Sequence, residues 1–61
     1  MSLLSSLTIE LLEEILENSR RELEIYELFN RHEEIIKTLL LIEYVKIELK
    51  VRELQEELKR C

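Results

Sequence analysis

A chain of 61 residues with a net charge of −5 can form one small domain but is too short for two independent hydrophobic cores. It contains no Gly or Pro, one Cys and one His, which excludes a disulfide framework or a multi-histidine metal site within one chain. The acidic balance disfavours nucleic acid and anionic membranes as partners, because both reward clustered Lys and Arg. Domains this small usually need external support, and here oligomerisation is what remains.

The composition is typical of helices. Hydrophobic residues make up 46% and charged residues 38% of the chain, and Leu, Ile, Glu, Lys and Arg dominate it. The longest apolar run, Leu39 to Ile42, is far shorter than the roughly 20 residues of a membrane span. The first seven residues lack the positive charge of a secretory signal. We therefore expect a soluble protein, cytoplasmic in a natural cell, with no membrane partner.

The first predicted element is a helix over residues 5–29. Asn18 followed by Ser19 could interrupt it, because Ser19 and Glu22 have the spacing of a capping box. A break there would place glutamates at a negative helix end and Arg20 and Arg21 at a positive one. The charges therefore favour one continuous helix, with Ser19 as a small polar residue on a buried stripe.

A turn is predicted at residues 30–32, followed by a second helix over 33–60. Asn30 is the best turn residue in a chain without Gly or Pro, and Asn30 with Glu33 has capping-box spacing. Glu33 and Glu34 suit the positive start of the second helix, and Lys59 and Arg60 suit its negative end. The chain is thus expected to be a single all-α domain over 1–61, an antiparallel helical hairpin that assembles into a homo-oligomeric bundle, most simply a dimeric four-helix bundle.

One segment supports a different interpretation. Residues 45–52 alternate apolar and charged side chains, as a half-buried β-strand does. No turn residues flank this segment, however, and the helical pattern continues to Leu58. The helix is the favoured interpretation.

The second helix carries two apolar surfaces. The first, here called the long stripe, has the three- and four-residue spacing of a coiled-coil seam and comprises Ile36, Leu40, Tyr44, Ile47, Val51, Leu54 and Leu58. The other, here called the second patch, comprises Ile35, Leu39, Ile42, Val45 and Leu49. We expect the long stripe to be the main packing seam and the second patch to need cover from another chain.

The apolar side of the first helix has the same kind of three- and four-residue spacing as the long stripe. The predicted interface residues of the assembly are Leu12, Leu16, Leu23, Tyr26, Ile35, Leu39, Leu40, Ile42, Tyr44, Val45, Ile47, Leu49, Val51, Leu54 and Leu58.

No motif for catalysis, a cofactor, a metal or a small-molecule substrate is present. His32 has no nucleophile or converging carboxylate pattern around it, and position 29 is Phe29, which rules out a Glu-x-x-His di-iron motif. The lone Cys61 could form an interchain disulfide if two C-termini meet, but a free thiol is the simpler expectation. We expect no enzyme, and no catalytic, cofactor-binding or metal-binding residue.

The favoured function is structural self-association, with the chain itself as partner. The alternative is a small interaction module whose apolar patch binds the amphipathic helix of another protein. A third hypothesis divides the chain at Asn18 and Asn30 into a three-helix DNA-binding arrangement, which the acidic balance disfavours. The alphabet, rich in Glu, Lys and Ile, resembles that of hyperthermophile proteins and of designed bundles, although designed bundles usually also contain Gly and Ala.

Overall fold

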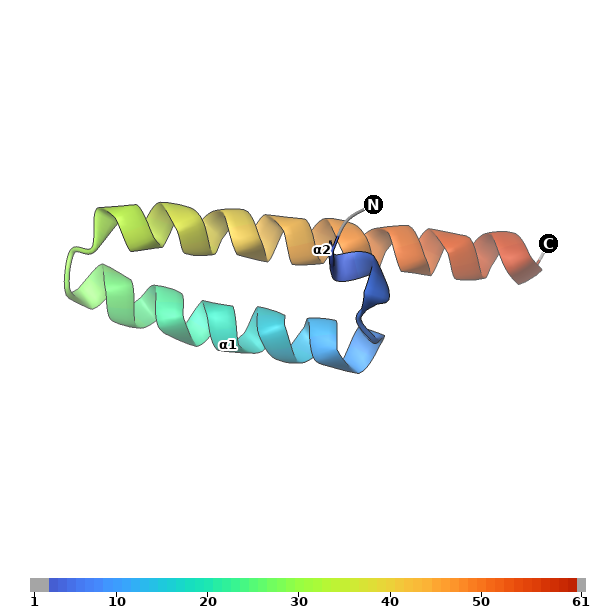
Figure 1. Ribbon diagram of the computed structural model, residues 1–61, viewed down its shortest axis with the longest axis horizontal. Coiled ribbons are helices and arrows are strands. Elements are labelled where there is room, and N and C mark those ends of the chain that lie inside the picture. Colours follow the sequence, from blue (N-terminus) through green and yellow to red (C-terminus); the bar gives the residue numbers. More distant parts are fainter. Residues whose placement is uncertain (1–2, 61) are drawn as a thin grey trace.

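Two antiparallel α-helices and one short 3₁₀ turn make up the structure. The computed structural model describes residues 3–60, in which η1 spans Leu3–Ser6, α1 spans Ile9–Leu28 and α2 spans His32–Arg60 (Figure 1). The two long helices pack side by side, and residues 3–60 contain no β-strand. The predicted all-α hairpin is confirmed.

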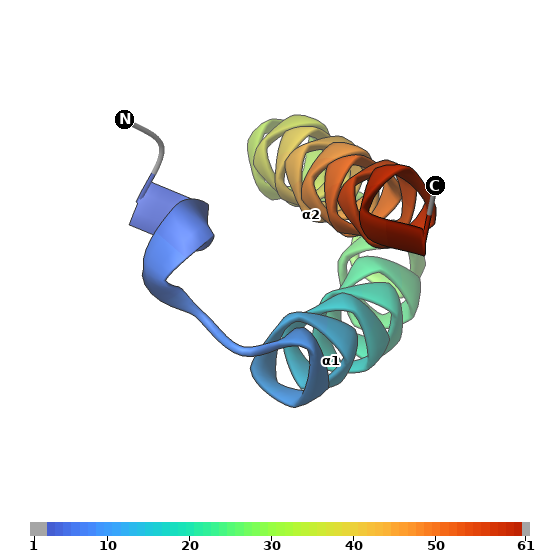
Figure 2. The same ribbon diagram turned by 90° about the vertical axis from the view of Figure 1, so that its right-hand side faces the viewer.

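The first helix begins later than predicted, at Ile9 rather than at residue 5. Thr8 has an extended backbone, with φ −74° and ψ 161°, and its Oγ1 accepts a hydrogen bond from the backbone N–H of Leu11 at 3.2 Å. This is the arrangement of a helix N-cap, which satisfies one of the free N–H groups of the first turn. Ser5 and Ser6 instead lie in η1, which folds back beside α2 (Figure 2).

The turn between the helices is a Schellman motif. Asn30 has φ 54°, in the left-handed region that Gly and Asn tolerate best. The backbone N–H of Asn30 donates to the carbonyl of Glu27 at 3.3 Å, and that of Arg31 donates to the carbonyl of Tyr26 at 2.9 Å. Asn30 therefore terminates α1. Asn30 does not form the predicted capping box with Glu33. An N-cap at Asn30 would need a helix that begins at Arg31, whereas α2 begins at His32.

Both helices are continuous. Asn18 and Ser19 lie inside α1, and residues 45–52 lie inside α2. The prediction of an unbroken first helix is confirmed, and the strand and three-helix alternatives are wrong. The charges at the ends of α2 are as expected, with Glu33 and Glu34 in its first turn and Lys59 and Arg60 in its last.

The hydrophobic core of the described residues is thin. Its fully buried apolar side chains are Leu12 and Val45, both 0% exposed, and Ile42 is 7% exposed. Ser19 and Thr38 are also buried, and small side chains at such positions let two helices approach closely. The molecule is elongated, with extents of 48 × 19 × 16 Å, because α2 continues beyond the N-terminal end of α1 (Figure 1).

Shortening a core side chain should test how much stability this thin core supplies. We expect Leu12→Ala to lower the free energy of unfolding by about 2–5 kcal/mol, since it leaves a cavity at a fully buried site. Leu28→Ala is the matched control, because Leu28 is 80% exposed, and it should change stability by less than about 0.5 kcal/mol. Urea unfolding followed by circular dichroism at one protein concentration measures both. Equal losses would contradict this description of the core.

Candidate interaction surface

The two apolar surfaces of α2 have the opposite roles to those predicted. Within a single chain, Ile42 and Val45 of the second patch are buried, and Ile35 and Leu49 are half-buried. Every residue of the long stripe is exposed, from 41% at Val51 to 76% at Leu58. The second patch therefore packs within the hairpin, apart from Leu39, which stays exposed. The long stripe is the surface left uncovered.

The residue pattern that marks the buried face of α2 includes a polar position. The buried face differs from the second patch because it contains Thr38 and lacks Leu39. This face is here called the inner stripe, has 3,4,3,4 spacing and comprises Ile35, Thr38, Ile42, Val45 and Leu49. On α1, the predicted interface residues with Ser19 form a matching α1 stripe of Leu12, Leu16, Ser19, Leu23 and Tyr26, all buried or half-buried. The predicted place of Ser19 on a buried stripe of α1 is confirmed, whereas the inner stripe of α2 was missed because one of its positions is the polar residue Thr38.

The two stripes mirror each other about the turn. Each residue of the α1 stripe has a counterpart in the inner stripe at the same separation from the turn: Tyr26 with Ile35, Leu23 with Thr38, Ser19 with Ile42, Leu16 with Val45, and Leu12 with Leu49. Mirrored three- and four-residue spacing is what two antiparallel helices need to interdigitate along their length. This mirror symmetry explains why the hairpin uses the inner stripe and not the more apolar long stripe.

The long stripe lies on the side of α2 roughly opposite to the inner stripe. At about 100° per residue, its seven positions cluster on one face of the helix, nearly half a turn from Thr38 and Val45. Neither α1 nor η1 covers this face, because all seven of its residues are exposed. Figure 2 shows α1 and η1 on two different sides of α2. An apolar face that extends over most of a 29-residue helix and stays exposed is a candidate interaction surface.

Charged residues of both signs follow one edge of the long stripe. Glu43 and Lys46 form an ion pair at 3.4 Å, and Lys50 and Glu53 form one at 3.7 Å, measured between side-chain nitrogen and oxygen. All four side chains are more than half exposed. Because these ion pairs are exposed to solvent, the same side chains can also pair with opposite charges on another chain.

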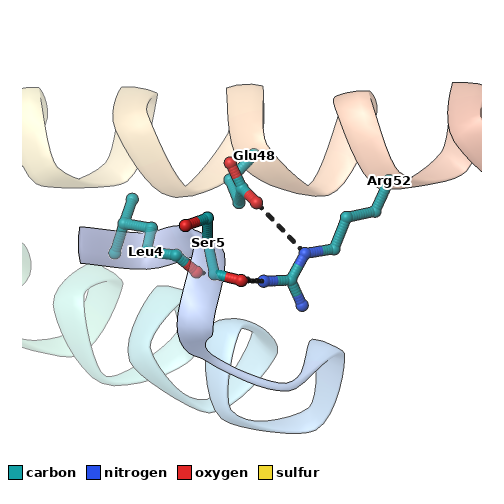
Figure 3. A network of polar contacts seen from close by, with 4 residues as sticks. All are labelled: Leu4, Ser5, Glu48 and Arg52. Carbon is teal, nitrogen blue, oxygen red and sulfur yellow. Dashed lines mark hydrogen bonds and ion pairs between the residues drawn. The ribbon is translucent and has the colours of Figure 1, made fainter. Parts of the chain in front are cut away.

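Arg52 joins η1 to α2 (Figure 3). Its Nη2 donates to the backbone carbonyls of Leu4 at 3.0 Å and Ser5 at 3.1 Å, and its Nε donates to Glu48 Oε1 at 3.1 Å. The side chains of Arg52 and Glu48 are only 17% exposed, so these charge-assisted bonds are partly shielded from water. Sequence analysis missed this role, although Arg52 continues the spacing of the inner stripe by one further step.

Removing the hydrogen bonds of Arg52 should release η1 without unfolding the hairpin. We expect Arg52→Met to speed amide hydrogen exchange around Leu7 by about tenfold or more, because hydrogen bonds to a charged group contribute about 1.5–3 kcal/mol. The helical circular dichroism signal should persist. Arg21→Met removes an exposed ion pair with Glu17 and serves as control. Unchanged exchange in Arg52→Met would show that η1 is held by other contacts.

Among the described side chains, the carboxyl of Glu34 has a clearly shifted pKa. Arg31 Nη2 donates to Glu34 Oε1 at 3.3 Å, and this bond, helped by the backbone N–H of Glu34 itself, lowers the pKa of the carboxyl below its ordinary value of 4.5. Arg31 precedes the first residue of α2, and its carbonyl accepts the backbone N–H of Ile35 at 2.9 Å. The pair therefore fastens the start of α2 to the turn.

The acidity of Glu34 gives a pH-dependent test. A carboxyl with a lowered pKa in the folded state stabilises the fold above its unfolded pKa, and this contribution is lost as the pH falls through the folded value. We expect Arg31→Gln to raise the Glu34 pKa towards 4.5 in an NMR titration, and to lower the melting temperature slightly at neutral pH but not in strong acid. Arg20→Gln should leave the Glu34 pKa lowered. A Glu34 pKa unaffected by Arg31→Gln would contradict the assignment.

A groove of about 440 Å³ lies where the end of α2 passes the start of α1. It is lined by charged residues of both signs and by two apolar residues: Ile9, Glu13, Leu49, Arg52, Glu53, Glu56, Glu57 and Arg60. The groove is the open continuation of the packing between the two helices, at the point where α1 no longer covers α2.

Chemical groups considered from the sequence are not gathered into a site in the described part of the chain. His32 is exposed at the first residue of α2. Residues 3–60 hold no cluster of three or more side chains able to ligate a metal, and no helix among them has the length and apolarity to cross a membrane. Cys61, expected to be a free thiol and considered for an interchain disulfide, lies outside the described residues.

Comparison with known proteins adds no family: no family model matches the chain, and neither a curated protein nor a solved structure is significantly similar to it. The exposed long stripe is therefore the feature of the molecule that points to a function.

Proposed function

We propose that this chain is a structural protein whose activity is self-association through the long stripe, without catalysis. The observation that carries the proposal is that this stripe stays exposed along α2 while the opposite face is buried against α1. In the assembly, α2 lies between its own α1 and the α2 of a second copy. Four helices result, with the two copies of α2 at the centre.

The exposed surface area supports a second copy as the occupant. A folded monomer of 7.4 kDa typically exposes about 4,200 Å², whereas this chain exposes 5267 Å². The excess is about 1,000 Å², close to the roughly 800 Å² that each partner contributes to a standard stable interface. Dimerisation would bring the exposed area per chain near that of an ordinary folded protein.

The radius of gyration supports the same conclusion. It is 13.7 Å for this chain, compared with about 10.5 Å for a compact domain of this length. The elongated shape explains the difference, because the single pair of helices measures 48 Å in one direction but only 19 and 16 Å in the other two. A second copy laid along α2 would thicken the molecule where it is thinnest and turn the long stripe into a second core layer.

Solution mass with a charge inserted into the stripe tests the proposal. With the Cys61 thiol kept reduced, we expect sedimentation equilibrium at micromolar concentration to give twice the 7.4 kDa of one chain. Ile47→Glu should raise the dissociation constant by about a hundredfold or more, because it places an unpaired charge in the interface. The control is Leu28→Glu, at an exposed apolar residue of α1 outside the stripe, which should remain dimeric.

A third variant separates the interface from the core. Ile42→Glu should unfold the hairpin itself, because Ile42 is buried within one chain. A wild-type chain that is folded and monomeric would overturn self-association and leave the stripe as a binding site for the helix of another protein. A dimer that survives Ile47→Glu would show that the long stripe is not its interface.

A further inference from the structure

The central part of the long stripe reads the same in both directions. Leu40, Tyr44, Ile47 and Val51 follow one another at intervals of 4, 3 and 4 residues. When a second α2 lies antiparallel and is centred between Val45 and Lys46, Tyr44 faces Ile47 and Leu40 faces Val51 of the second copy, each contact occurring twice. Such self-complementarity is what a two-fold symmetric interface requires.

The charges at the edge of the stripe are self-complementary in the same arrangement. Glu43 and Lys50 each directly precede a stripe residue, Tyr44 and Val51, on the same side of the seam. In an antiparallel pair of helices, edge positions of this kind face each other across the interface. Glu43 is 64% and Lys50 is 66% exposed, so each can turn towards an opposite charge on a second copy.

Resting on the proposed self-association, we propose that the second copy binds antiparallel in this register, with Glu43 of each chain paired to Lys50 of the other. The interface then has a two-fold axis at the middle of α2, and it places the two α1 helices on the outer sides. The apolar stripe supplies the contact area, and the two symmetric charge pairs select the orientation and register.

The competing arrangements bring like charges together. A parallel pair in register places Lys37 opposite its own copy and Glu43 beside Glu48 of the second chain. An antiparallel pair shifted by one heptad pairs more apolar residues, but it places Lys50 opposite its own copy and Glu43 opposite Glu57. The register centred between Val45 and Lys46 avoids both repulsions.

Charge reversal distinguishes the three arrangements. We expect Glu43→Lys and Lys50→Glu each to raise the dissociation constant of the dimer by about three- to tenfold, since each converts two attractive pairs into repulsive ones. The double variant should restore wild-type affinity. Glu17→Lys is the matched control, because it breaks an exposed ion pair on α1, with Arg21, and should leave the affinity unchanged. Sedimentation equilibrium at low salt measures all four.

Each result has a separate meaning. Tighter association of Glu43→Lys would overturn the proposed register, because the introduced lysine would then meet Glu48 in the parallel dimer or Glu57 in the shifted one. Loss of affinity in both single variants without recovery in the double variant would also overturn it. In either case the dimer itself would stand, whereas a monomeric wild-type chain would remove self-association altogether.

Discussion

The connection between the helices determines which surface of α2 meets α1. Only Phe29, Asn30 and Arg31 separate α1 from α2. Asn30 holds a left-handed backbone, and Arg31 donates its N–H back to Tyr26, so the chain leaves α1 in one fixed direction. A connection this short gives α2 little freedom to rotate about its axis. The mirrored spacing of the two packed stripes agrees with the face that the turn selects.

This constraint explains why the more polar stripe of α2 is the buried one. Thr38 on α2 and Ser19 on α1 are small, and their burial is consistent with a close approach of the two helices. No fully buried side-chain nitrogen or oxygen in residues 3–60 lacks a hydrogen-bond partner. The larger Leu, Ile and Tyr side chains of the long stripe are left on the outer face, where they remain exposed in the single chain.

The helices and the turn could be predicted from the sequence because local chemistry decides them. The absence of Gly and Pro, the midpoint Asn30 and the end charges of α2 all act within a few residues. The roles of the two apolar faces could not, because hydrophobicity ranks the long stripe first and the choice depends on the geometry of the turn. The link from Arg52 to η1 was also missed, since it joins segments almost fifty residues apart. The late start of α1 had a local signal in Thr8. Its hydroxyl suits an N-cap, but the prediction placed Thr8 inside the helix.

The charged outer side of α1 limits how far the proposed assembly can grow. The exposed residues on that side include Glu10, Glu17 and Arg21, whose charges separate the exposed apolar side chains Leu11, Ile25 and Leu28 along the helix. Because each copy has one long stripe, a dimer that forms through the two stripes leaves neither of them free to bind a further copy. Association then stops at a closed dimer instead of continuing into a fibre, although the α2 helix of every subunit has apolar side chains on two opposite faces.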